Sequence, residues 1–92
     1  MGIDFTDSAH KHGIEERDAL HAIRNAVYTS TRVKVTDSGL PDRPRRVFVG
    51  PEHAQTDRLI EVLIEMVAGG FVVFHAMPLG SYYRRQMEEE KG

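Results

Sequence analysis

Residues 59–77 read LIEVLIEMVAGGFVVFHAM, and this stretch decides the class of fold. Along Leu59–Val67 a wholly apolar face alternates with a face that carries two glutamates, and this period of two is typical of a β-strand. Gly69-Gly70 is a strong signal for a tight turn, and Phe71–Met77 is almost wholly apolar, as a strand inside a sheet would be. The stretch therefore predicts a hairpin of two neighbouring strands.

A helix over Thr56–Ala68 is the competing interpretation of the first half of this stretch, because its residues have fair helix propensity. The alternation of its β-branched residues and the glycine pair that follows favour a strand. We prefer the strand, and both interpretations stay open at the level of sequence.

Two further strands are predicted before the hairpin. Thr31–Thr36 alternates polar and apolar residues, and Arg45–Gly50 does the same. The residues between them, Asp37–Pro44, are rich in Asp, Gly and Pro, which is typical of a loop, and Pro51–Asp57 is a second loop. The sequence thus predicts an antiparallel sheet of three to four strands.

Helices are predicted at both ends of the chain. Thr6–His12 is expected to form a short helix that ends at Gly13, in the left-handed conformation that suits glycine. Glu15–Tyr28 has apolar residues at helical spacing, and Ser81 is placed to cap a short helix that runs to the C-terminus. The fold class is therefore α+β, with two N-terminal helices, and residues 1–92 form a single domain.

The period of two divides the strand residues between two faces of the predicted sheet. We expect the early helices to cover an apolar face, because each element must bury its apolar side. That face is formed by Val33, Val35, Val47, Val49, Ile60, Val62 and Ile64. The opposite, polar face is formed by Arg32, Lys34, Arg46, Glu61 and Glu65. A polar open face is either solvated surface or a functional site.

Composition limits the classes of function. The chain has no cysteine, which excludes cysteine nucleophiles and cysteine-bound zinc and favours a reducing, cytoplasmic location. It contains no run of apolar residues long enough to cross a membrane, and its opening residues do not predict a signal peptide. A net charge of −2 argues against a nucleic-acid binder unless the charge segregates to one face, because phosphate contacts supply most of such affinity.

Three stretches resemble the BrnT-like toxins of type II toxin–antitoxin systems, within the RelE-like ribonuclease group. They are Phe5 with Ala9-His10-Lys11-His12-Gly13-Ile14, then Arg46-Val47-Phe48-Val49-Gly50, and lastly Val72-Val73-Phe74-His75-Ala76-Met77-Pro78 followed by Tyr83-Arg84-Arg85. Their order and spacing extend over nearly the whole chain. The family usually has an arginine just after the last strand, where this chain has Met77.

The resemblance implies a small RelE-like fold and a metal-independent endoribonuclease, an mRNA interferase that blocks translation without a cofactor. It implies a small cognate antitoxin as partner, RNA as substrate, and contact with DNA only through an antitoxin complex. The alternative is a non-catalytic binding module of the same fold, a degenerate toxin or a small regulatory partner protein, which the acidic net charge and Met77 favour. An exposed sheet edge would also allow a homodimer.

Cleavage of RNA through its 2′-hydroxyl needs a base, an acid and cations that stabilise the transition state. His75 is the first catalytic candidate, because it lies where the last strand ends and an imidazole suits acid–base work near neutral pH. The alternative is a structural histidine, hydrogen-bonded inside the sheet. Arg46 is the second candidate, because its planar guanidinium binds phosphate in bidentate fashion. Its alternative is a solvated residue paired with Glu61 or Glu65.

Other residues are candidates for binding the substrate. Arg32 and Lys34 are expected to help Arg46 hold the phosphate, while Arg84 and Arg85 would add positive charge on the last helix. Tyr83 would stack on a base. The alternative is that Leu79, Tyr83 and Met87, spaced by four, form the buried stripe of that helix while the arginines pair with Glu88 and Glu89.

The other histidines have simpler interpretations. Lys11 and His12 are expected to serve the junction before the second helix, and His53 is expected to be exposed in a loop. His10, His12 and His21 lack the spacing of a known zinc motif, so no metal site is predicted.

Overall fold

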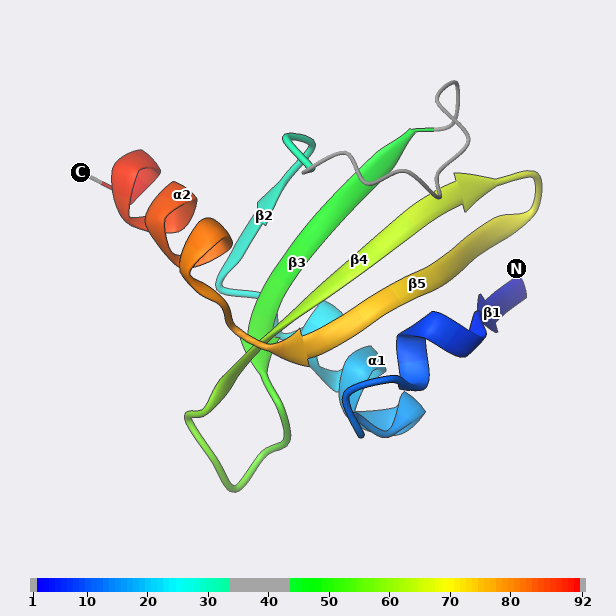
Figure 1. Ribbon diagram of the computed structural model, residues 1–92, viewed down its shortest axis with the longest axis horizontal. Coiled ribbons are helices and arrows are strands. Elements are labelled where there is room, and N and C mark those ends of the chain that lie inside the picture. The colour runs from blue at the N-terminus through cyan, green and yellow to red at the C-terminus, as the bar shows by residue number, and fades with distance from the viewer. Residues whose placement is uncertain (1, 34–43, 92) are drawn as a thin grey trace.

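A five-stranded mixed sheet, in the order β1-β5-β4-β3-β2, runs through the molecule (Figure 1). The computed structural model describes residues 2–33 and 44–91. The strands are β1 (Gly2–Phe5), β2 (Tyr28–Ser30), β3 (Arg45–Pro51), β4 (Leu59–Val67) and β5 (Gly70–Pro78). The helices are the 3₁₀ helix η1 (Asp7–His10) and the α-helices α1 (Glu16–Arg24) and α2 (Ser81–Lys91). The α+β class is confirmed.

The predicted hairpin is confirmed, and the helix over Thr56–Ala68 is wrong. Strands β4 and β5 pair in antiparallel fashion, and Gly69 turns the chain between them with a φ of +80°. Every second residue of β4 from Ile60 to Ile64 is buried on one face, which is the burial that the alternation predicts.

The parallel pair β1–β5 is a feature that the sequence did not predict. Gly2–Phe5 pairs with β5 from Gly70 to Val73, so the sheet is mixed and has five strands instead of three to four antiparallel ones. The two backbones approach closely: a Cβ atom on Gly70 would lie 1.8 Å from the carbonyl oxygen of Gly2. Glycine is therefore needed where these strands meet.

The N-terminal helices are shorter than predicted. A single 3₁₀ turn, η1, replaces the helix over Thr6–His12, although Gly13 does adopt the expected left-handed conformation with a φ of +76°. Helix α1 ends at Arg24, and Tyr28 already belongs to β2. The chain therefore enters the sheet three residues earlier than the predicted strand Thr31–Thr36, whose first three residues are not in a strand. The second half of this predicted strand, from Lys34 to Thr36, and the predicted loop up to residue 43 lie outside the described residues.

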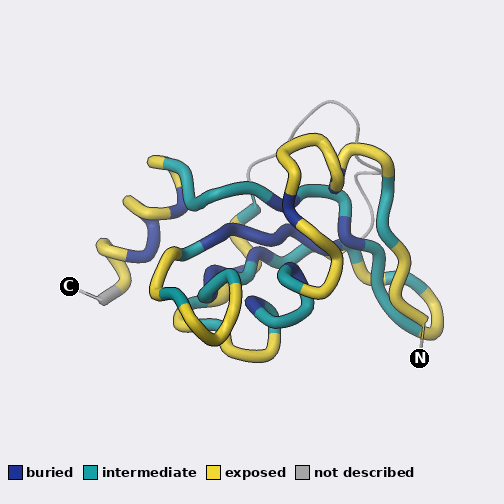
Figure 2. Tube along the Cα trace, turned by 90° about the horizontal axis from the view of Figure 1, so that it is seen from below, coloured by how far each residue is buried: buried dark blue, intermediate teal, exposed yellow. Residues whose placement is uncertain are grey.

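Both faces of the sheet carry an apolar cluster. The α1-side cluster contains Ala9, Ile14, Ala19, Ala22, Ile60, Val62, Ile64, Val73 and Ala76. The α2-side cluster contains Val47, Val49, Leu63, Tyr83 and Met87, with Val33 and Phe74 among the partly buried residues packed against it. The buried stretches, dark blue in Figure 2, run through the middle of the molecule.

The predicted single apolar face is therefore wrong for β3. Val47 lies opposite Leu63 and Val49 opposite Glu61, so both valines face α2, whereas Ile60, Val62 and Ile64 face α1. A register that differs by one residue moves every side chain of a strand to the other face. The alternation within one strand does not determine its register with the next strand, so the sequence could not show which face Val47 and Val49 occupy.

A β-bulge interrupts the pairing of β4 with β5. Ile64 lies opposite Val73 and Leu63 opposite His75, so Phe74 is an additional residue on β5. Strict alternation would place His75 on the same face as Val73. The additional residue instead places Val73 and Ala76 in the α1-side cluster, and Phe74 and His75 both lie toward the α2 side.

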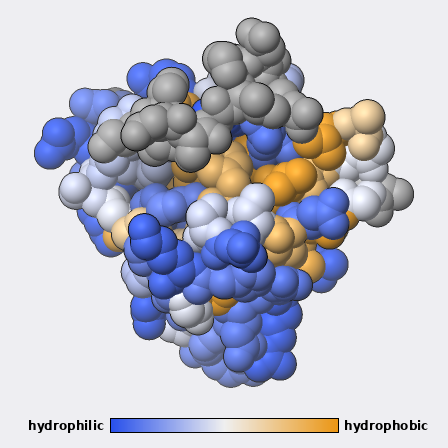
Figure 3. All heavy atoms as spheres, turned by 45° about the vertical axis from the view of Figure 1, so that its right-hand side comes forward, coloured by the Kyte–Doolittle hydropathy of each residue, from blue (hydrophilic) through white to orange (hydrophobic). Residues whose placement is uncertain are grey.

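Apolar side chains are also exposed at the end of the sheet where the β4–β5 turn and β1 lie. Ile3 and Met66 are among the exposed large hydrophobic residues. Figure 3 shows an apolar region, in orange, bordered by polar atoms on this side of the molecule. None of the helices in the described residues is long and apolar enough to span a bilayer.

Candidate functional site

The strongest candidate site is an imidazole held by a buried carboxylate. His75 on β5 and Glu61 on β4 lie on the α2 side of the sheet, and His75 Nε2 is 3.0 Å from Glu61 Oε2. The side chain of Glu61 is 7% exposed and that of His75 is 28% exposed. The carboxylate is thus shielded while the imidazole remains accessible, and the bond occupies Nε2 but leaves Nδ1 available for proton transfer.

The second oxygen of Glu61 fixes the carboxylate to the start of α2. The backbone N–H of Gly80 donates a hydrogen bond of 2.9 Å to Glu61 Oε1. A Cβ atom at position 80 would lie 3.3 Å from that oxygen, so a residue larger than glycine would crowd it. Glu61 therefore joins β4, β5 and α2, and its charge lies beside the N-terminal end of a helix, which favours an anion.

A second imidazole lies beside the first. The ring centres of His12 and His75 are 5.7 Å apart, and the rings meet edge to face at 70°. The segment that carries His12 is fixed to the edge of β5, where the backbone N–H of Thr6 donates to the carbonyl of Val73 and Ser8 Oγ donates to the carbonyl of Phe74. The described elements thus bring together two histidines that are far apart in the sequence.

Arg46, the second catalytic candidate, does not join this site, because it lies on the opposite face of the sheet from His75. Arg46 lies opposite Ile64 in the register, which places it on the α1 side of the sheet, and its Nη1 donates to Thr29 Oγ1 at 3.2 Å. Glu61 and Glu65, expected on the same face as Arg46, lie on the other face. The cause is the register between β3 and β4, which the sequence did not give.

Among the described strand residues, Arg45 is the cation on the face of His75. It lies opposite Glu65, with Arg45 Nη2 3.6 Å from Glu65 Oε1, and its guanidinium carbon is 5.4 Å from the centre of the Phe74 ring. The guanidinium is thus positioned by an ion pair and an aromatic face. Sequence reasoning selected the neighbouring arginine.

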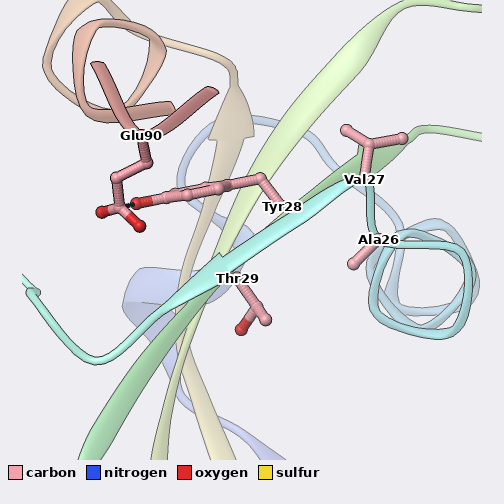
Figure 4. Close-up of a pocket in the computed structure, with 5 residues that line it drawn as sticks. All are labelled: Ala26, Val27, Tyr28, Thr29 and Glu90. Atoms are coloured by element: carbon pink, nitrogen blue, oxygen red, sulfur yellow. Dashed lines mark hydrogen bonds between the residues drawn. The ribbon is translucent and has the colours of Figure 1, made fainter. Parts of the chain in front are cut away.

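Arg32 belongs to a separate polar cluster, the Tyr28 clasp, which consists of Tyr28, Arg32, Gln86 and Glu90. The Tyr28 hydroxyl lies 2.8 Å from Gln86 Oε1 and 2.6 Å from Glu90 Oε2, and its single proton serves one acceptor at a time. Arg32 pairs with Glu90, and Gln86 Nε2 donates to the Arg32 carbonyl at 3.0 Å. Figure 4 shows the phenol reaching from β2 to the carboxylate on α2, at a shallow pocket of about 370 Å³.

The clasp perturbs the ionisation of its members. Burial, followed by the hydrogen bond to Glu90, raises the pKa of Tyr28 above its ordinary 10.0. The hydrogen bonds from Tyr28 and then Arg32 lower the pKa of Glu90 below 4.5, and the bond to Glu90 raises the pKa of Arg32. These interactions attach α2 to β2. Because the guanidinium of Arg32 is paired with Glu90 in this cluster, its predicted role in holding a phosphate is not supported.

Of the predicted substrate-binding residues on α2, Tyr83 is buried, whereas Arg84 and Arg85 are exposed. Tyr83 is 3% exposed within the α2-side cluster, with Met87 beside it, so the buried stripe is confirmed and base stacking by Tyr83 is wrong. Arg84 and Arg85 are exposed, and neither forms an ion pair with a carboxylate of the described residues. Their predicted role in binding a substrate stays a prediction.

A second pocket, of about 640 Å³, lies between the start of α1 and the loop after β3. Its lining includes the acidic Glu15, Asp18 and Glu52 and the histidines His21 and His53. Within residues 2–33 and 44–91 no three His, Cys, Asp or Glu side chains are grouped closely enough to hold a metal ion. His10 is engaged by Glu16, with His10 Nε2 2.8 Å from Glu16 Oε2.

Sequence reasoning found His75 but missed its two neighbours. Glu61 was assigned to a polar open face, either solvated surface or a site, and was not paired with His75, because the register of β4 with β5 leaves no mark in the sequence. His12 was assigned to a helix junction. A carboxylate in an otherwise apolar strand was the available signal for Glu61, since such a group is seldom buried without a partner.

Comparison of the chain with protein-family models, with curated proteins and with solved structures finds no significant match.

Proposed function

We propose that this chain is a toxin-like, metal-independent endoribonuclease of the BrnT-like kind, controlled by a small antitoxin protein. The observation that carries the proposal is the His75–Glu61 pair, in which a shielded carboxylate orients a partly exposed imidazole. Among the described residues, it is the arrangement best suited to proton transfer, because the imidazole is oriented and also partly exposed.

In this proposal Glu61 is a positioning residue and His75 is the base. The ionised carboxylate accepts a hydrogen bond from the Nε2–H of His75, which leaves the lone pair on Nδ1 free to take the proton of the RNA 2′-hydroxyl. The 2′-oxygen then attacks the adjacent phosphorus. The exposed Arg84 and Arg85 on α2 supply positive charge toward the phosphates.

The first test is RNA cleavage by the purified protein in the presence of a chelator. We expect cleavage that the chelator does not abolish, and a loss of about 10²–10⁴-fold in the His75→Ala variant, which is the usual effect of removing an acid–base group. His53→Ala is the matched control, because His53 is an exposed loop histidine. Absence of cleavage by the unaltered protein would refute the nuclease and leave the non-catalytic binding module.

The Glu61→Gln variant separates positioning from catalysis. A glutamine keeps the size of the side chain but removes the charge that orients the imidazole. We expect kcat to fall by less than the about 10²–10⁴-fold loss in His75→Ala, with KM unchanged. A change in KM alone would show that Glu61 acts in binding and would contradict this role.

A further inference from the structure

We propose that His12 is the second proton-transfer group of the same site, the acid that protonates the leaving 5′-oxygen. This inference rests on the proposed function. Its physical basis is the edge-to-face contact of the two imidazoles, with ring centres 5.7 Å apart. Two oxygens bound to one phosphorus can reach one nitrogen of each ring, because each such hydrogen bond is about 2.6–3.2 Å long.

The two histidines differ in hydrogen bonding and in exposure to solvent, and these differences suit one to act as a base and the other as an acid. His75 is bound through Nε2 to the buried Glu61, so its orientation is fixed and its free nitrogen is Nδ1. His12 is exposed and its side chain makes no hydrogen bond with the described residues, so water can reprotonate it between turnovers. The oriented imidazole of His75 therefore suits the role of base, and the exposed imidazole of His12 suits the role of acid.

The position of His12 is built into the fold. Ser8 Oγ donates to the carbonyl of Phe74 at 2.8 Å, and Gly13 immediately after His12 has a φ of +76°. The chain therefore turns sharply at the point where it passes the edge of β5. Phe74, whose carbonyl anchors this segment, is the additional residue of the bulge that directs His75 to the α2 side.

The reaction balances without a further reactant. The proton of the 2′-hydroxyl moves to Nδ1 of His75, the 2′-oxygen forms a bond to phosphorus, and the bond from phosphorus to the 5′-oxygen breaks. The leaving oxygen takes a proton from the His12 imidazolium. The products are a 2′,3′-cyclic phosphate and a 5′-hydroxyl, and exchange with water restores both rings. The substrate class is therefore RNA with an intact 2′-hydroxyl, and DNA is not cleaved.

The test compares two variants on two substrates. His12→Phe keeps an aromatic ring against His75 but cannot donate a proton, and His75→Phe is its counterpart. One substrate is a natural oligoribonucleotide; the other has sulfur in place of the bridging 5′-oxygen, and a thiolate leaves without an acid. We expect His12→Phe to lose about 10²–10⁴-fold on the natural substrate and to cleave the sulfur substrate at the rate of the unaltered protein. His75→Phe should lose activity on both substrates.

Two outcomes would overturn the inference while leaving the proposed function intact. One is natural-substrate cleavage by His12→Phe at the unaltered rate; another is an equal loss on both substrates, which indicates a structural role. If the unaltered protein cuts neither substrate, the proposed function itself fails. The far-ultraviolet circular dichroism and the Tm of each variant exclude unfolding as the cause.

Discussion

Gly50 shows how one residue sets the distance between a helix and the sheet. A Cβ atom at Gly50 would lie 2.3 Å from the backbone carbonyl oxygen of Ala22, which is closer than non-bonded atoms can approach. Helix α1 therefore rests directly on the backbone of β3, and the methyl group of Ala22 is fully buried there. Because the obstacle is backbone, no side-chain rotation can relieve the contact.

We expect Gly50→Ala to destabilise the protein by about 1–3 kcal/mol, the usual cost of overpacking a closely packed core. The measurement is the free energy of unfolding from urea titration followed by circular dichroism. Gly2→Ala is the control, because no atom lies within 4 Å of a Cβ at that position and its φ is outside the left-handed region that favours glycine. Equal effects of the two substitutions would show that α1 does not lie against β3 as described.

At the scale of elements, the Tyr28 clasp connects α2 to β2 through hydrogen bonds and an ion pair. Its hydrogen bonds lower the pKa of Glu90 below 4.5, so the ionised carboxylate stabilises the folded protein more than the unfolded one. This contribution is complete above the ordinary value of 4.5 and is lost as the pH falls through the lowered pKa. The raised pKa of Tyr28 has the opposite sign: its contribution is lost as the pH rises beyond 10.0.

We expect Glu90→Gln to be less stable than the unaltered protein at neutral pH, with the difference shrinking as the pH falls below 4.5. The check is urea denaturation of both proteins from neutral pH to the acid limb. Glu88→Gln is the matched control, since Glu88 is exposed on the same helix and has no partner among the described residues. A pH-independent difference between the unaltered protein and Glu90→Gln would contradict the role of the charge.

Regular elements were predictable from sequence where local periodicity determines them. The alternation in Leu59–Val67 and the turn at Gly69 define the hairpin, and the i, i+4 spacing of Tyr83 and Met87 defines the buried face of α2. The pairing between elements was not predictable, because register and bulges depend on contacts between distant residues. This is why Arg46 was placed on one face with Glu61 and Glu65, although the sheet separates it from both.

At the scale of the whole molecule, the sheet separates two apolar clusters, and each depends on its own helix. Met87 is 7% exposed in the α2-side cluster, whereas Met66 is 44% exposed at the end of β4. The same residue type thus occupies a packed position in one layer and an open position at the sheet's end. The pair allows the contribution of the α2 layer to be measured directly.

We expect Met87→Ala to destabilise the protein by about 2–5 kcal/mol, because it leaves a cavity between α2 and the sheet. Met66→Ala should change the stability by no more than about 0.5 kcal/mol, as most exposed substitutions do. Thermal unfolding followed by circular dichroism measures both. Similar small effects of the two substitutions would show that α2 is not an integral layer of the fold.

The bulge in β5 has a consequence for how chains of this architecture can diverge. Val73 before the bulge and His75 after it already match the faces of their partners Ile64 and Leu63. Loss of Phe74 would therefore leave a regular ladder with the imidazole still beside Glu61. A strand interior normally resists single-residue deletion, but here a shortened homologue can keep the imidazole on the same face of the sheet.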